Sequence, residues 1–189
     1  MGLTRPIDLR RAPLAYVRAT DLRAPERDFW ADEAALWARL QDGWTDLDDA
    51  AWRLPGAAPS DAGGPDWSLL DHVAHIAAWQ SLAVAYTATA LASGRWPTDD
   101  DFAAGDFDGF NERLRAEWAG FDPAEVRHRL RSGRDQLLAN AHRLGLDAIR
   151  ADAAREWVYL TLPGHYLDHM AIVEAWVGRL RARDEGAAE

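Results

Sequence analysis

The chain has 189 residues, of which 48% are hydrophobic, and both values are typical of one globular domain with a sizeable core. Its formal net charge of -10 argues against a nucleic-acid partner and against an anionic membrane surface, because phosphates repel an acidic protein. The sequence contains neither Cys nor Lys, which excludes disulfides, thiolate sites, Schiff-base catalysis and a Walker lysine.

Residues 1–24 are expected to form an N-terminal arm, since they hold two prolines and scattered Arg. They lack the apolar stretch of a secretory signal, and no run of the sequence is apolar enough to span a bilayer. We therefore expect a cytoplasmic protein. The first helix is predicted to start near Pro25, because Pro is favoured at the first helical position and acidic residues follow it.

The second helix is predicted from Ser68 to about Ser93. Ser68 and Asp71 have the spacing of a capping box, in which each side chain accepts a hydrogen bond from the backbone N–H of the other. Gly94 is a typical helix stop. This helix is apolar on nearly all sides, so we expect it to be the most buried.

A long connection follows, with a short helix predicted over residues 111–118. The third helix is predicted over residues 123–144, and the fourth from about residue 163 to residue 183. The tail, residues 184–189, is expected to be disordered.

These elements predict an all-α domain over residues 25–183. Four long amphipathic segments without strand rhythm are typical of a four-helix bundle. The long connection between the second and third helices favours a crossover. No segment is a convincing strand, although residues 157–162 can form a short extended piece.

Histidines in two of these helices are placed to meet inside the bundle. His165 and His169 lie four residues apart in the fourth helix, so their rings share one face about a turn apart. His75 lies on the apolar second helix. The two helices are therefore expected to bring three imidazoles together above an apolar floor of aromatic side chains, namely Trp79, Tyr86 and Trp176.

Three imidazoles and a water form a recurrent open ligand set for a catalytic divalent ion. Imidazole without thiolate favours Zn or Ni over Fe or Cu. The open position would hold water or bind a substrate thiol or carbonyl oxygen. Tyr166 stands where the H-E-x-x-H metalloproteases have their Glu, which argues against a peptidase of that type.

Other interpretations of the polar residues stay open. Buried histidines often only satisfy one hydrogen bond, and a pair four apart can bond to backbone carbonyls. His72, near His75, can be a fourth ligand, a residue that orients a ligand or a helix-end residue, and we favour the last two. Asp71 can orient a ligand ring or serve only as a helix cap. His128 and His142 are expected at the surface.

The segments WSLLDHVAHIAAW and GHYLDHMAIVEAW resemble those of the DinB/YfiT-like metalloenzyme family, and the resemblance covers residues 25–183 in length and helix order. It implies a four-helix bundle in which one His of the second helix and an H-x-x-x-H pair of the last helix hold a divalent ion. Matched residue by residue, these ligands are His75, His165 and His169. Residues 1–24 match nothing in the family, and His72 is additional to its usual pattern.

The family includes bacillithiol- and mycothiol-dependent S-transferases and isomerases, in which the metal activates the thiol of a low-molecular-weight cofactor. The resemblance thus implies a metal-dependent transferase or hydrolase that acts on a small molecule, and a homodimer. Two other classes stay open. One is a non-catalytic module that sequesters a small apolar compound, with a structural metal or none, and the other is a helical interaction protein without metal.

Overall fold

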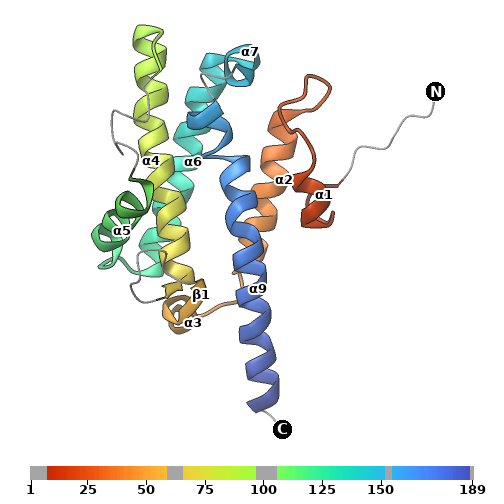
Figure 1. Cartoon of the computed structure of the whole chain (residues 1–189), viewed down its shortest axis with the longest axis vertical. Helices are drawn as coiled ribbons and strands as arrows, with labels where there is room; N and C mark the ends of the chain where they lie inside the picture. Colours follow the sequence, from red (N-terminus) through yellow and green to blue (C-terminus); the bar gives the residue numbers. More distant parts are fainter. Residues whose placement is uncertain (1–7, 59–65, 97–105, 152–154, 188–189) are drawn as a thin grey trace, which may run out of the picture.

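The computed structural model describes residues 8–58, 66–96, 106–151 and 155–187, and these ranges are mostly helical (Figure 1). The four long helices are α2 (Phe29–Asp42), α4 (Leu69–Ser93), α6 (Pro123–Leu144) and α9 (Pro163–Ala187). The shorter elements are α1 (Leu14–Arg18), α3 (Asp49–Arg53), α5 (Phe107–Trp118), α7 (Leu146–Arg150), the strands β1 (Pro55–Ala58) and β2 (Trp67–Ser68), and the π-helical turn η2 (Arg155–Tyr159). The predicted all-α class is confirmed. Within the described ranges, no helix combines the length and the apolar character needed to cross a membrane.

Side-chain caps set the ends of the long helices. At the start of α4, the Ser68 hydroxyl oxygen accepts from the Asp71 N–H at 3.2 Å, and the Asp71 carboxylate accepts from the Ser68 N–H at 2.8 Å. The predicted capping box is therefore present. Gly94 ends α4 with a φ of 69°, a left-handed conformation that glycine adopts without steric cost. At the start of α6, the Asp122 side chain accepts from the Glu125 N–H.

The first and last long helices have ends that differ from the prediction. The first was expected to start near Pro25, but α2 begins at Phe29, because the Asp28 carboxylate accepts from the next N–H groups and is its N-cap. Helix α9 continues to Ala187, beyond the predicted end at residue 183. Residues 188–189 lie outside the described residues.

The N-terminal segment contributes to the core, although residues 8–24 were predicted as part of an arm. Three of its apolar side chains are buried in the core shared with the long helices: Leu9, Val17 and Leu22. The Arg18 guanidinium of α1 donates to the Leu167 carbonyl oxygen of α9 at 2.8 Å. This segment therefore packs along the helix that carries two of the candidate ligands. Residues 1–7 lie outside the described residues.

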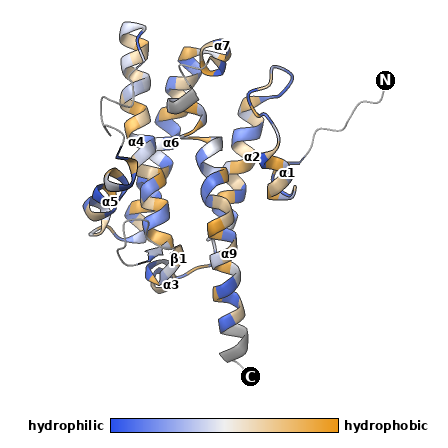
Figure 2. Ribbon diagram, in the orientation of Figure 1, coloured by the Kyte–Doolittle hydropathy of each residue, from blue (hydrophilic) through white to orange (hydrophobic). Residues whose placement is uncertain are grey.

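The long helices pack in two pairs. Figure 1 shows α4 and α6 running in one direction, while α2 and α9 run in the opposite direction. Helix α4 packs along α6, and α2 packs along α9. Hydrophobic and hydrophilic residues are interspersed along these helices (Figure 2). Helix α5, in the connection between α4 and α6, packs against α4.

One buried polar network connects the four long helices. The Glu33 carboxylate of α2, 1% exposed, accepts from the Arg134 guanidinium of α6 at 2.6 and 2.8 Å and from the Tyr166 hydroxyl of α9 at 3.1 Å. The Gln80 amide of α4 donates to the same hydroxyl oxygen at 3.2 Å. Burial and the nearby Glu33 raise the pKa of Tyr166 well above its ordinary value, so its hydroxyl stays protonated. No pattern in the sequence predicted this network.

Two short segments also differ from the prediction. Strands β1 and β2 pair antiparallel, with Pro55 opposite Ser68, where no strand was predicted. Segments of 4 and 2 residues are too short to display the alternation that predicts a strand. Residues 157–162, a candidate extended piece, instead form part of η2 and the turn before α9. Burial of Trp157 at 2% exposure indicates that tertiary packing overrides the local strand preference.

Candidate metal centre

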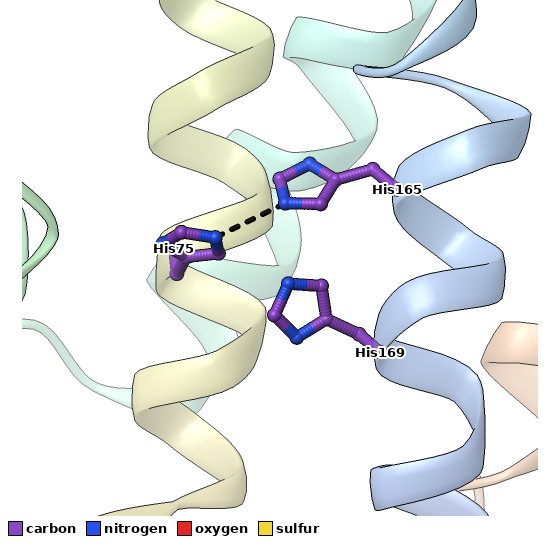
Figure 3. Close-up of side chains that lie close together, drawn as sticks. All are labelled: His75, His165 and His169. Atoms are coloured by element: carbon purple, nitrogen blue, oxygen red, sulfur yellow. Dashed lines mark hydrogen bonds between the residues drawn. The ribbon is translucent and has the colours of Figure 1, made fainter. Parts of the chain in front are cut away.

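Three histidine side chains from two helices point toward one another in the interior (Figure 3). His75 comes from α4, and His165 and His169 come from α9. The Nε2 atoms of His75 and His165 are 3.0 Å apart. One ring nitrogen from each of the three side chains lies within 4.8 Å of the other two. His75 and His165 are buried and His169 is half-buried, so the cluster is largely shielded from solvent.

A close backbone approach positions the start of α9. A Cβ atom at Gly164 would lie 2.9 Å from the Tyr159 carbonyl oxygen and 3.3 Å from the Leu160 side chain. Glycine therefore allows the first turn of α9 to pack directly on the preceding π-helical turn. His165 and His169 follow one turn apart and face His75.

Burial keeps all three imidazoles neutral. It lowers the pKa of His75, His165 and His169 well below the ordinary value, and neighbouring imidazoles lower it further. Among the described residues, the Nδ1 atoms of His75 and His165 are buried without a hydrogen-bond partner. A neutral imidazole has one donor and one acceptor nitrogen, so two facing Nε2 atoms form at most one hydrogen bond. The cluster therefore leaves buried ring nitrogens unsatisfied.

The facing Nε2 atoms of His75 and His165, rather than their unpaired Nδ1 atoms, fit a divalent ion together with one nitrogen of His169. Imidazole nitrogens bind Zn²⁺ at about 2.0–2.1 Å, which places two ligands of a tetrahedral site roughly 3.3 Å apart. The separation of 3.0 Å between His75 and His165 is close to that spacing, and the third nitrogen lies within 4.8 Å of both. An all-imidazole donor set suits Zn, Ni, Cu and Fe rather than Ca or Mg.

A fourth histidine contacts the cluster from one side. His72 of α4, 4% exposed, places its Nδ1 atom 3.1 Å from the Nδ1 atom of His169. Burial lowers the pKa of His72 to about 4, while Asp71 acts to raise it and Arg115 lowers it further. Both rings are thus neutral at pH 7, and one donates to the other. His72 can therefore fix the tautomer and orientation of the His169 ring, as groups around metal ligands commonly do.

Asp71 reaches none of the histidine rings through a hydrogen bond in the described part of the chain. Its carboxylate accepts from the Ser68 N–H at 2.8 Å and from the Ser68 hydroxyl at 2.7 Å. It also pairs with Arg115 of α5 at 3.3 Å. The sequence left two roles open for Asp71, and these contacts are those of a helix cap. The ion pair with Arg115 also connects α4 to α5.

A pocket of about 300 Å³ opens beside the histidines, which form part of its wall. Its aromatic wall consists of Trp79 of α4, Phe107 of α5 and Trp157 of η2. The Trp79 and Phe107 rings are stacked, with centroids 6.3 Å apart. The Trp79 indole N–H donates to the Asn111 side-chain oxygen of α5 at 3.0 Å. A concave, mainly apolar site with a few polar groups is typical of small-molecule binding.

Of the three predicted pocket aromatics, only Trp79 is in this wall. Tyr86 packs edge to face on Trp157, with ring centroids 4.4 Å apart, and so supports the wall from behind. Trp176 lies next to Gly56 of β1 and is buried there. An α-helix rises about 1.5 Å per residue, which places Trp176 roughly 16 Å along α9 from His165. The pocket is bounded by α5 and the η2 region in addition to α4 and the start of α9, because residues of those two elements line the rest of its wall.

Several wall residues were not predicted as site residues: Phe107, Asn111, Trp157, Leu160, Thr161 and Asp168. Most come from α5 and the η2 region, whose position against α4 cannot be read from spacing. Asp168 is the exception, because it lies three residues after His165 and therefore about one turn along the same helix. Partial burial raises the pKa of Asp168, and Arg18 acts to lower it.

The fold and the site define an all-α protein with a three-histidine cluster able to hold a metal ion. The sequence model of the DinB superfamily matches residues 34–173, well over half of the chain. The chain therefore belongs to the DinB superfamily, which confirms the resemblance found in its two histidine segments. No curated protein and no solved structure gives a significant match.

Proposed function

We propose that this protein is a metal-dependent enzyme of the DinB/YfiT-like type, a transferase or hydrolase in which His75, His165 and His169 hold Zn²⁺ or Ni²⁺. The observation that carries the proposal is the meeting of three neutral, inward-facing imidazoles beside a pocket of small-molecule size. The four long helices would form the four-helix bundle of the family, with α5 in the crossover connection.

The ion would supply the activation of the reacting group, and the side chains would orient the ligands and bind the substrate. When bound, the ion would lower the pKa of a thiol or water in its open coordination position. His72 would hold the ring of His169 through their 3.1 Å contact. The aromatic side chains of Trp79, Phe107 and Trp157 would bind the apolar part of the substrate and exclude water from the reacting groups.

We further propose that the activated group is the thiol of a low-molecular-weight cofactor, so that the reaction is S-transfer to an electrophilic small molecule. The resemblance of the two histidine segments supports this choice, and the adjacent pocket offers the electrophile a place to bind. A homodimer is proposed on the same resemblance, and a cytoplasmic location on the sequence alone.

Metal content tests the proposal directly. The full-length protein, purified without an affinity tag, should contain close to one equivalent of Zn or Ni by elemental analysis. The His169→Ala variant should lose most of it, because two imidazoles bind such an ion more weakly than three. The His128→Ala variant, which removes an exposed histidine, is the matched control and should keep its metal. Full metal stoichiometry in His169→Ala would reject the assignment.

The aromatic pocket also favours a second candidate, a module that sequesters a small apolar compound without converting it. In that case any ion would be structural, and chelation should unfold the domain. For the enzyme, chelation should abolish adduct formation between a thiol such as cysteine and an electrophile while the helical circular dichroism signal persists. Measuring both signals in one chelator titration separates the two functions.

A further inference from the structure

The pocket wall contains one carboxylate that pairs with no other described residue. Asp168 lines the pocket next to His169, and its side chain makes no hydrogen bond or ion pair within the described ranges. The guanidinium of Arg18 donates to the backbone carbonyl oxygens of Leu167 and Asp168, at 2.8 and 3.4 Å, and not to the Asp168 carboxylate. The carboxylate itself is therefore left for another partner.

The other polar side chains of the wall are already engaged. The Asn111 oxygen accepts from the Trp79 indole N–H at 3.0 Å. The Thr161 hydroxyl donates to the Trp157 carbonyl oxygen at 3.0 Å. Apart from the neutral imidazoles, the rest of the described wall is aromatic or aliphatic. Asp168 is thus the one ionised side chain in the described wall of the pocket.

Asp168 is exposed to solvent at the pocket wall, so its carboxylate is open to the charged group of a ligand, which would form a charge pair with it. Asp168 also lies outside the group of three ligand nitrogens, so its charge is available to a ligand in the pocket. Aromatic faces attract cations as well, which adds to the effect of the carboxylate. In the metal-free pocket an anionic ligand would instead be repelled by Asp168, whereas a bound divalent ion would attract an anion to the three histidines.

We propose that the pocket selects a small molecule with an apolar body and a positively charged amine, the amine bound by Asp168 and the body by the aromatic wall. The inference rests on the proposed function in taking this pocket as the substrate site, and it specifies the charge of the substrate. It predicts that Asp168 governs which molecules bind, while the three histidines govern whether metal binds.

Three phenyl compounds of similar size and different charge test the proposal: 2-phenylethylamine, 2-phenylethanol and 3-phenylpropanoate. Their binding to the full-length protein is measured by calorimetry at low salt after zinc is removed by chelation, because a bound ion in the same wall would itself attract the carboxylate. The amine should bind roughly three- to tenfold more tightly than the alcohol, as expected for one partly screened charge pair, and the carboxylate should bind most weakly. The preference should decrease as salt is raised.

Variants assign the preference to Asp168. In Asp168→Asn the amine should bind no more tightly than the alcohol, while binding of the alcohol and the zinc content stay unchanged. Glu117→Gln removes an equal charge at an exposed position of α5 outside the wall and should keep the preference. The proposal is overturned if the wild type shows no preference for the amine, if the preference survives in Asp168→Asn, or if millimolar amine fails to bind. Loss of zinc alone from Asp168→Asn would also overturn it, because the carboxylate would then act on the ion.

The two proposals fail in different measurements. Absence of zinc from the wild type would contradict the metal centre, yet the charge preference of the zinc-free protein would still be measurable. A protein that contains zinc as purified but shows no charge preference after chelation would retain the proposed metal centre and contradict only the role of Asp168.

Discussion

His165 and Tyr166 are neighbours in the sequence, yet they enter two buried polar clusters that differ in how their hydrogen bonds are met. The Tyr166 hydroxyl joins Glu33 and Arg134, where a carboxylate accepts from a guanidinium and a phenol. The His165 ring instead faces another imidazole nitrogen at 3.0 Å, and its own Nδ1 atom has no partner among the described residues.

The difference indicates what each cluster is for. Buried polar groups in native proteins are nearly always hydrogen-bonded, and an unmet one costs about 1–3 kcal/mol. In the buried polar network, Glu33, Arg134 and Tyr166 partner one another, and the Gln80 side-chain oxygen at its edge has no partner among the described residues. The network connects the four long helices. In the imidazole cluster, three neutral rings turn nitrogens toward one another and share few protons, so these converging nitrogens call for an external partner such as a metal ion. Local violations of this kind are expected at functional sites.

Acidification should produce the largest effect and should act through the imidazole cluster. In the metal-free protein, burial lowers the pKa of the four clustered histidines, so between pH 7.5 and 5 the unfolded chain binds protons that the folded chain does not. The stability present above pH 6.5 is therefore lost as the pH falls. His72, with a pKa of about 4, accounts for about 2 kcal/mol of this loss, and the other three act in the same direction.

Urea unfolding of the chelated protein at the two pH values measures this loss. The double variant His128→Ala and His142→Ala removes exposed histidines and should show the same loss as the wild type. An unfolding free energy that stays constant over this pH range would show that the buried imidazoles are not held neutral.

Removing Glu33 should produce the next largest effect, this time on the ionic network. Glu33→Ala leaves Arg134 and the Tyr166 hydroxyl without their acceptor, which should lower the unfolding free energy by about 3–5 kcal/mol. Urea unfolding at pH 7.5 measures the change. The control is Asp42→Ala, which lies on α2 like Glu33 and loses an exposed ion pair with Arg10. It should change the unfolding free energy by less than about 1 kcal/mol. Equal effects of the two variants would contradict the structural role of the network.

Removing His72 should have the smallest effect, and it tests whether His72 orients the His169 ring for metal binding. His72→Ala deletes the 3.1 Å contact with His169 but none of the three candidate ligands. Zinc affinity should fall about 10- to 100-fold, while the stoichiometry at saturation stays unchanged. Competition with a chromophoric chelator measures the affinity, with His142→Ala as the control. If zinc affinity is the same in both variants, His72 does not orient a ligand.

The candidate ligands could be predicted from the sequence because two of them are related by helical spacing. His165 and His169 share a face in any α-helix that contains them. That His75 meets them was inferred from the apolar faces and aromatic residues of the two helices and from the resemblance to a known family, because spacing alone does not say which faces of separate helices come together. His72 was identified as ambiguous for the same reason, since its contact with His169 crosses from α4 to α9.

The pocket was less predictable than the ligands. Its wall combines Trp79 of α4 with Phe107 of α5 and Trp157 of η2, elements that are far apart in the sequence. The expected floor at Trp176 followed from treating the two histidine helices as the whole site. The π-helical turn could not be foreseen, since its sequence has the aromatic and β-branched residues that usually favour strands.

The helical class, the capping box and glycine stop of α4, and the imidazole pair of α9 follow from residues within a few positions of one another, and so they could be predicted from the sequence. Which helices pack together, how Glu33 meets Arg134, and which side chains surround the imidazoles depend on the folded structure. These contacts join residues about a hundred positions apart, and they form because burying the apolar helix faces brings the polar groups between them into contact.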